Sequence, residues 1–376
     1  MALIPGCATE QGTARYRERF ADRLPDHFRQ VHGLWLSSLG LGTYLGEADA
    51  RYDGYYGETV TRALGLGINV IDSAVNYRHQ RSERSAGQAI AALIAQSKLS
   101  RDEFFVATKG GFLTFDGSPP EDPASYFYEQ VIRSGLALEQ DVAAECHVMT
   151  PKYLAHQIEV SRRNLGLETI DLYYLHNPET QLSRVDRPAF YGRLKEAFVA
   201  LEQAVAAEKV RFYGTATWNA YRVAPESGEA VDLNQVLRAA EEAGGSGHHF
   251  RAVQLPFNLA MPEALVGRTQ RLDGQLVPFL RLATGRNLMV FASASLLQGQ
   301  LAEGIPPELA RRFPQLATDA QRALQFVRST PGITCALVGM SSVEHVEQNV
   351  ATATVPPLSL EQYRALFAAA GSEQGA

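Results

Sequence analysis

Residues 170–176 read IDLYYLH, and residues 210–216 read VRFYGTA. Both runs are almost continuously apolar, which is typical of parallel strands that are buried on both faces of a sheet. Six further β-rich runs alternate with amphipathic helical segments along the chain. Eight strand–helix units in series predict a parallel sheet with right-handed crossovers, and eight is the number that closes a (β/α)8 TIM barrel.

The predicted strands cover residues 36–44, 68–73, 103–109, 170–176, 210–217, 252–257, 287–293 and 334–340. The clearest predicted helices cover residues 82–95, 150–165 and 318–328. An open, doubly wound sheet is the alternative, and it would need a G-x-G-x-x-G turn after the first strand. Gly40, Gly42 and Gly46 miss that spacing, so we interpret them as turn residues.

The composition excludes several classes of protein. Hydrophobic residues make up 45% of the 376 residues and charged residues 20%, which is globular composition. The net charge is −6 and there is no long basic run, so we expect no nucleic-acid partner. The sequence has no run of 18 apolar residues, so we expect no membrane span. The N-terminus lacks a secretory pattern and only three scattered cysteines occur, which favours a reducing cytoplasm. We expect no metal, because the adjacent residues Glu145, Cys146 and His147 cannot easily share one ion.

Four chemically useful side chains fall at or just beyond the ends of three successive predicted strands. They are Asp72 and Tyr77 after the second strand, Lys109 at the end of the third and His176 at the end of the fourth. Barrel enzymes place their chemistry at these ends. An ammonium paired with Asp72 would lower the pKa of a nearby phenol, and a neutral imidazole could hydrogen-bond the same substrate oxygen. Taken singly, each residue could equally be a structural ion pair or a cap.

The chain resembles the aldo-keto reductase superfamily from residue 36 to residue 349. The resemblance rests on GLGTY at 40–44, the D-x-x-x-x-Y pair at 72–77, TKGG at 108–111, LHNPE at 175–179 and GMSSVEHVEQN at 339–349. It implies a barrel that binds NAD(P)H without a Rossmann domain and transfers a hydride between nicotinamide and a carbonyl carbon. The family's catalytic tetrad falls on Asp72, Tyr77, Lys109 and His176, with the tyrosine as acid or base.

The same resemblance implies a set of binding residues. Those for the coenzyme are Gly42, Thr43, Tyr44, Asp72, Ala216, Thr217, Gln254, Ser293, Ser295, Leu296, Gln298, Gly299, Gly339, Ser341, His345, Gln348 and Asn349. Those for the substrate are Tyr44, Phe112 and Asn177. Family grounds favour NADP(H), with NAD(H) as the alternative; Arg311 and Arg312 are candidates for the 2′-phosphate.

Three departures from the family pattern matter for the site. At the end of the fifth strand, Ala216 and Thr217 stand where the family usually offers Ser and then Asn or Arg to the carboxamide. Arg78 replaces the glycine that usually follows the tyrosine; with Arg81 and Arg84 it could favour an anionic substrate or form a solvated, salt-bridged surface. Ser293 takes the place of an aromatic residue that commonly stacks on the nicotinamide. Phe257 or Tyr213 could then supply the missing ring.

Because the site residues spread from 42 to 349, we expect one barrel domain at 34–376 rather than the two or three domains that length alone allows. Residues 1–33 form an N-terminal extension, and residues 355–376 a C-terminal helix or tail. Residues 112–149 are a long insertion after the third strand. This insertion is a candidate substrate lid, with a simple surface elaboration as the alternative.

We therefore expect a cytoplasmic NAD(P)H-dependent oxidoreductase that acts on a small carbonyl or sugar substrate. One alternative is a nicotinamide-binding redox sensor or regulatory subunit with little catalysis. Another is a sugar (aldose) 1-dehydrogenase, which shares the site and differs in substrate. The sequence does not indicate the oligomeric state.

Overall fold

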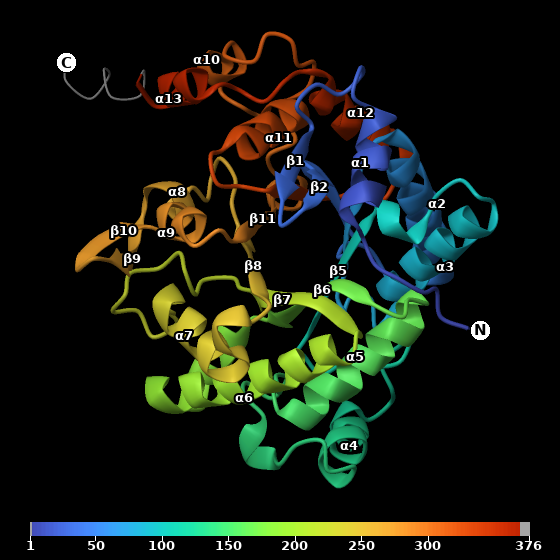
Figure 1. Cartoon of the computed structure of the whole chain (residues 1–376), viewed down its shortest axis with the longest axis vertical. Coiled ribbons are helices and arrows are strands. Elements are labelled where there is room, and N and C mark those ends of the chain that lie inside the picture. Colours follow the sequence, from blue (N-terminus) through green and yellow to red (C-terminus); the bar gives the residue numbers. More distant parts are fainter. Residues whose placement is uncertain (1, 369–376) are drawn as a thin grey trace.

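A closed barrel of eight parallel strands forms the centre of the computed structural model, which describes residues 2–368 (Figure 1). Each strand pairs with the next along the chain, and the last closes on the first, as the sequence predicts for a (β/α)8 barrel. The barrel strands are β3 (Leu39–Gly42), β4 (Val70–Asp72), β5 (Phe105–Gly110), β6 (Ile170–His176), β7 (Val210–Ala216), β8 (Phe250–Pro256), β11 (Met289–Ser293) and β12 (Cys335–Gly339).

Alternation along the strands explains why they read as continuous apolar runs. In β6, Leu172 and Tyr174 belong to the cluster inside the barrel, where they meet Phe105 of β5. Tyr173 and Leu175 belong to the outer cluster, between the strands and the helices. Both faces are buried, so both need apolar side chains.

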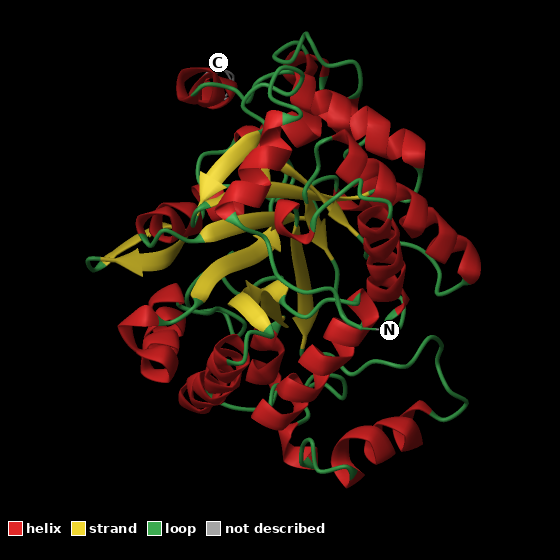
Figure 2. Cartoon of the chain, turned by 45° about the vertical axis from the view of Figure 1, so that its right-hand side comes forward, coloured by secondary structure: helices red, strands yellow, loops and turns green. Residues whose placement is uncertain are grey.

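Helices surround the barrel on its outside (Figure 2). Their limits follow capping signals: Asp49 and Thr150 accept from backbone N–H groups at the starts of α2 and α5, and Gly67 and Gly166 end these helices with left-handed φ. The larger helices are α2 (Ala50–Leu66), α3 (Arg81–Ala95), α5 (Pro151–Leu165), α6 (Arg187–Ala206), α7 (Leu233–Gly244), α9 (Phe279–Gly285), α11 (Asp319–Ser329) and α12 (Val343–Ala351). The shorter helices α8 (Glu263–Val266) and α10 (Pro307–Ala310) lie in loops, and a hairpin of β9 (Arg268–Leu272) and β10 (Gln275–Pro278) precedes α9.

The prediction of one strand at 36–44 is wrong, because the run is divided between two sheets. β2 (Leu34–Ser37) pairs antiparallel with β1 (Phe28–Val31), and β3 begins only at Leu39. Leu34 and Leu36 pack into the cluster inside the barrel, so this hairpin closes the barrel at the amino ends of its strands. An apolar run shows burial but not the strand with which each half pairs.

The segments outside the repeat are also folded. In the N-terminal extension, Tyr16 of α1 (Glu10–Glu18) is fully buried and donates a hydrogen bond to the carbonyl of Leu64 in α2. The 112–149 insertion contains α4 (Pro123–Phe127) and a π-helical turn (Tyr128–Arg133), at the edge of the molecule in Figure 1. The predicted C-terminal helix is α13 (Leu360–Ala368); residues 369–376 lie outside the described residues.

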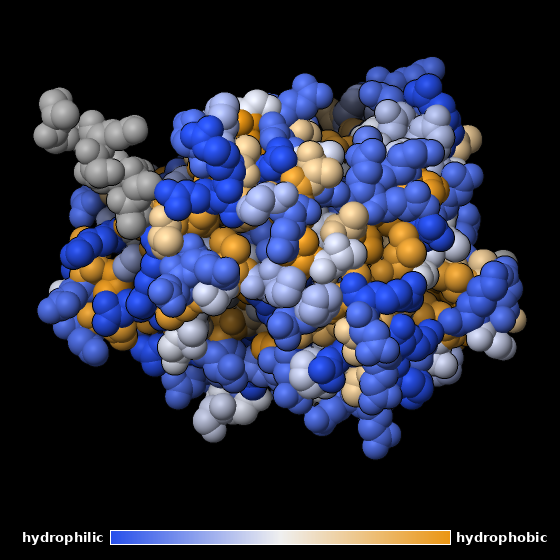
Figure 3. All heavy atoms as spheres, turned by 90° about the horizontal axis from the view of Figure 1, so that it is seen from above, coloured by the Kyte–Doolittle hydropathy of each residue, from blue (hydrophilic) through white to orange (hydrophobic). Residues whose placement is uncertain are grey.

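The described part of the chain has no helix that is both long and apolar enough to cross a membrane. On the face shown in Figure 3, hydrophobic side chains are interspersed with hydrophilic ones. Two of the large hydrophobic side chains that are exposed, Tyr44 and Trp218, line the cavity described next.

Candidate active site

A cavity of about 860 Å³ opens at the carboxyl ends of the barrel strands. Of the catalytic, coenzyme and substrate residues that follow from the family motifs, all line it except Lys109, which is fully buried. The expected residues that line it are Gly42, Thr43, Tyr44, Asp72, Tyr77, Phe112, His176, Asn177, Ala216, Thr217, Gln254, Ser293, Ser295, Leu296, Gln298, Gly299, Gly339, Ser341, His345, Gln348 and Asn349. The fold thus brings together residues that are up to about three hundred positions apart.

A buried ion pair lies at the base of this cavity. The Lys109 ammonium donates to Asp72 Oδ2 at 2.5 Å and to the carbonyl of Ser73 at 2.8 Å, while Gln254 Nε2 donates to Asp72 Oδ1 at 2.7 Å. Burial is the largest single effect on the pKa of Lys109 and lowers it, but Asp72 and Tyr77 together raise this pKa by more, so the ammonium stays charged. Gln254 therefore uses its amide N–H group to hold Asp72.

Tyr77 sits between this cation and two other rings. The Lys109 Nζ atom is 4.7 Å from the centroid of the Tyr77 ring, and the rings of Tyr44 and His176 lie 5.0 and 5.8 Å away. Burial raises the pKa of Tyr77 above its usual value, and the Lys109 ammonium lowers it by a smaller amount. The sequence prediction had the direction of the Lys109 effect but not the larger effect of burial, so the phenol is held in its protonated form.

His176 ends β6 and faces Tyr77 across the cavity. Burial and then the nearby Lys109 ammonium keep its pKa well below the usual value, so the imidazole is neutral. Its Nδ1 atom is buried without a hydrogen-bond partner among the described residues, which leaves Nε2 as the ring nitrogen open to the cavity. The Phe112 ring packs edge-on against it, 4.9 Å between centroids.

The 112–149 insertion supports this histidine from behind. His147 Nε2 lies 2.8 Å from the carbonyl oxygen of His176, and the Gln181 amide nitrogen lies 3.0 Å from His147 Nδ1. Since the amide can only donate, Nδ1 accepts and Nε2 carries the proton. A Cβ atom at Gly111 would come within 2.8 Å of His147 Nε2, which explains the second glycine of the TKGG motif. Sequence reasoning missed His147 because no motif contains it.

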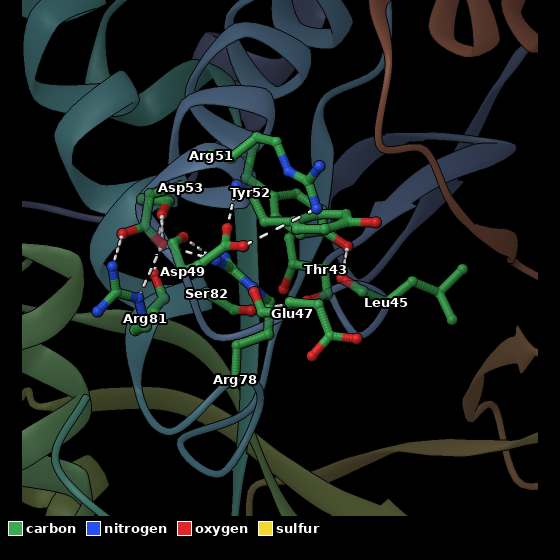
Figure 4. Close-up of polar contacts among 12 residues, drawn as sticks. Thr43, Leu45, Glu47, Asp49, Arg51, Tyr52, Asp53, Arg78, Arg81 and Ser82 are labelled. Atoms are coloured by element: carbon green, nitrogen blue, oxygen red, sulfur yellow. Dashed lines mark hydrogen bonds and ion pairs between the residues drawn. The ribbon is translucent and has the colours of Figure 1, made fainter. Parts of the chain in front are cut away.

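Arg78 is ion-paired with Asp53, as one alternative expected, but it is buried rather than solvated, and it does not line the cavity. Its backbone is left-handed, with φ +48°, and its side chain is only 1% exposed. The guanidinium donates to the carbonyls of Glu47 and Asp49 and to the Asp53 carboxylate, at 2.7, 3.0 and 2.7 Å (Figure 4). It therefore ties the loop after β3 to α2 and turns away from the cavity.

Neither Arg81 nor Arg84 lines the cavity either, so the expectation of an anionic substrate has no support there. Arg81 also binds Asp53, as Figure 4 shows, and Arg84 pairs with Asp116 at 2.5 Å. The alternative of a solvated surface fits Arg84, which is 39% exposed, but is wrong for Arg78. Sequence alone did not show that a nearby carboxylate and two carbonyls would bury this cation.

The other half of the cavity is lined mainly by backbone and small side chains. Ala294, Leu297 and Gln298 all have left-handed φ, between +47° and +53°, in the loop after β11. Such turns direct several peptide groups toward one side of the chain, which is how backbone N–H groups form anion-binding concavities. The backbone of this loop, which lines the cavity at Ala294 and Gln298, is therefore where an anionic group such as a diphosphate could be held.

Two expectations for this half are wrong. Phe257 and Tyr213 are fully buried and do not line the cavity, so neither replaces the ring missing at Ser293. Arg311 and Arg312 do not line it either. Within residues 2–368, no three His, Cys, Asp or Glu side chains converge as they would to hold a metal ion.

The structure adds residues that the sequence reasoning did not single out. Trp218 lies two residues beyond β7 and is 45% exposed at the cavity; its backbone N–H group donates to the Glu179 carboxylate at 2.6 Å. Its place after a barrel strand was a usable signal. The other cavity residues that the sequence did not single out are Leu45, Asn76, Ala294, Ala302, Glu303, Thr318, Ala320, Leu337 and Val338. Glu303 does not directly follow a barrel strand, so its position gave no signal in the sequence.

Two of the relatives that resemble this chain match it over more than three quarters of both sequences. An uncharacterized oxidoreductase of Mycobacterium bovis is 28% identical over 370 residues, which cover 89% of this chain and 90% of that protein. L-galactose dehydrogenase of Arabidopsis thaliana is 24% identical over 315 residues, which cover 79% and 77%.

Solved structures give the same fold. An aldo/keto reductase from Klebsiella pneumoniae, in complex with NADP and acetate, superposes with a TM-score of 0.61 at 23% identity and covers 92% of this chain and 95% of its own. The model of the aldo/keto reductase family matches residues 38–236, more than half of the chain. The protein is therefore a member of the aldo/keto reductase family.

Proposed function

We propose that this protein is a cytoplasmic, nicotinamide-dependent oxidoreductase that interconverts an uncharged carbonyl compound and its alcohol. The observation that carries the proposal is the placement of Tyr77, with the Lys109–Asp72 pair behind it and His176 beside it, on one elongated cavity. When bound, the coenzyme supplies or accepts a hydride. The chain itself must then position the carbonyl group and move one proton.

Tyr77 supplies that proton. Its raised pKa keeps the phenol protonated near neutral pH, so it can donate to the carbonyl oxygen as charge develops there. The phenolate left behind is stabilised by the Lys109 ammonium, 4.7 Å from the ring centroid. His176, neutral and open to the cavity at Nε2, donates a hydrogen bond to the same oxygen. In the oxidative direction the phenolate takes the proton back.

The residues around the catalytic tyrosine favour an uncharged substrate. Tyr44, Phe112 and Trp218 supply aromatic walls, and Asn76 and Asn177 supply amides. No lysine or arginine lines the cavity in the part of the chain that the structure describes. A polyhydroxylated ring suits such a lining, because its C–H faces pack on aromatic rings and its hydroxyls bond amides. A sugar dehydrogenase is therefore the second candidate function, with L-galactose dehydrogenase among the relatives.

The test compares Tyr77→Phe with wild type on a panel of aldehydes, ketones and aldoses. Loss of the proton donor should lower turnover by about a hundredfold or more, the range of general acid catalysis. Coenzyme binding, measured by fluorescence of the reduced nicotinamide, should be unchanged. Tyr55→Phe is the matched control, since this exposed tyrosine of α2 does not line the cavity.

Full activity of Tyr77→Phe would refute the mechanism. A wild-type protein that binds the coenzyme but turns over no member of the panel would instead point to the regulatory alternative.

A further inference from the structure

The charges at one end of the cavity bear on which coenzyme it holds. This end is formed by Ser341, His345 and Gln348 around the start of α12, and by Glu303 and Thr318 from the segment that follows β11. The residues on the α12 side offer a hydroxyl, an imidazole and an amide, whereas Glu303 is a carboxylate exposed to solvent.

Hydrogen bonds hold these two segments against each other. The backbone N–H group of Ile305 donates to Asp319 Oδ2 at 3.0 Å, which anchors the Glu303 loop to the start of α11. The Gln321 side chain donates to the carbonyl of Gln348 at 2.9 Å, which anchors α11 to α12. These contacts place the backbone that carries Glu303, two residues before Ile305, on the side of the cavity where α11 meets α12.

The start of α12 is poorly suited to a further anion. A helix N-terminus favours negative charge, but this one carries Glu344 in its first turn, and the Ser342 side chain caps it through the N–H group of His345. Arg62 of α2 is paired with Glu347 of α12 at 2.5 Å. The positive charge of the helix N-terminus and of Arg62, which could attract a phosphate, is thus already compensated by Glu344 and Glu347.

No lysine or arginine among the described lining residues makes up for this. Of the described residues that line the cavity, none is lysine or arginine, and residues 1 and 369–376 contain neither in the sequence. Arg322, near the rim, is paired with Asp319 at 2.6 Å. Lys109 is at the other end and is paired with Asp72.

We infer that this cavity selects NAD(H) over NADP(H), and that Glu303 is the residue that determines the choice. A ribose with a free 2′-hydroxyl can donate a hydrogen bond to a carboxylate, whereas a 2′-phosphate carries nearly two negative charges and needs a cation. This reverses the preference that family resemblance implies, and it rests on the proposed function, because it presumes that the cavity binds a nicotinamide dinucleotide.

The experiment measures dissociation constants of NADH and NADPH for the full-length protein at low ionic strength. Energy transfer from Trp218, which lines the cavity, to the reduced nicotinamide gives a readout that does not depend on turnover. We expect NADH to bind at least about tenfold more tightly than NADPH, a difference of about 1.4 kcal/mol. Glu303→Gln should narrow this ratio several-fold, and Ser341→Arg should tighten NADPH binding by about tenfold.

Glu308→Gln is the matched control, because it removes the same charge from an exposed residue of α10 that does not line the cavity. If Glu303→Gln changes the ratio no more than this control, the role of Glu303 is refuted. Equal or tighter binding of NADPH by wild type would overturn the inference and leave the proposed function intact. If neither coenzyme binds, the proposed function fails, and the inference fails with it.

Discussion

Removing the Arg78 side chain should destabilise the fold, and the size of the effect should depend on which residue replaces it. The guanidinium makes three hydrogen bonds, two to the carbonyls of Glu47 and Asp49 and one to the Asp53 carboxylate. The Arg78 backbone has φ +48°, a conformation that residues other than glycine rarely adopt. Two opposing contributions therefore meet at one position.

Their magnitudes can be estimated separately. Breaking a buried ion pair by removing one partner costs about 3–5 kcal/mol, and here two backbone carbonyls also lose a charged donor. The left-handed conformation costs about 1–2 kcal/mol for a residue with a Cβ atom. Arg78→Ala should thus lower the free energy of unfolding by about 3–5 kcal/mol. Arg78→Gly should lower it by about 1 kcal/mol less, because glycine pays no such cost.

The assay is urea unfolding followed by circular dichroism, with free energies extrapolated at constant slope. Arg81→Ala serves as the matched control, because it removes a partly exposed partner of the same Asp53 carboxylate and should cost about 1 kcal/mol or less. Arg78→Lys should not rescue the fold, since an ammonium cannot replace the planar fork that bridges Glu47 and Asp53. A glycine variant that is no more stable than the alanine variant would refute the account of the backbone.

Two further predictions concern titration. Lys109→Met should raise the apparent pKa of the acid group in the pH profile of reduction, and an unchanged profile would show that Lys109 does not lower that pKa. The same variant should lower the free energy of unfolding by about 3–5 kcal/mol, because it leaves Asp72 buried without its partner. Adding Asp72→Asn should restore most of that free energy. Burial raises the pKa of Glu179 to about 7. The folded protein therefore holds a proton there that the unfolded chain releases, so stability relative to Glu179→Gln should fall by at most about 3 kcal/mol between pH 4.5 and 7. A difference between the two proteins that does not vary with pH would contradict this.

Much of the barrel could be predicted because its strands are buried on both faces. Runs such as 170–176 and 210–216 differ from the structure by a residue or less, since continuous apolarity and flanking turns leave few alternatives. The run at 36–44 failed because two strands with different partners follow one another there, separated only by Ser38. Burial can be read from a sequence, whereas pairing depends on segments far away.

The candidate site shows the same division. Motifs placed Tyr77 and His176 on one cavity, because they lie near the carboxyl ends of neighbouring strands and a barrel brings those ends together. Glu303 and His147 lie in loops, and only the path of those loops brings them to the site. The direction in which the pKa of Tyr77 shifts could not be predicted from the sequence either. Burial is a property of the packed structure, and it raises this pKa by more than Lys109 lowers it.

Charge links the whole chain to its proposed ligand. A protein with a net charge of −6 that binds a dinucleotide must compensate the diphosphate locally, and this cavity offers peptide groups after β11 rather than cations. Backbone N–H groups can compensate a diphosphate that lies against them, but they are fixed to one place along the cavity. Of the described residues that line the cavity, none is a lysine or arginine that could compensate a third phosphate at the ribose. The lack of lysine and arginine in the described lining suits an uncharged substrate at Tyr77. The same lack argues for NAD(H) at the end of the cavity near α12.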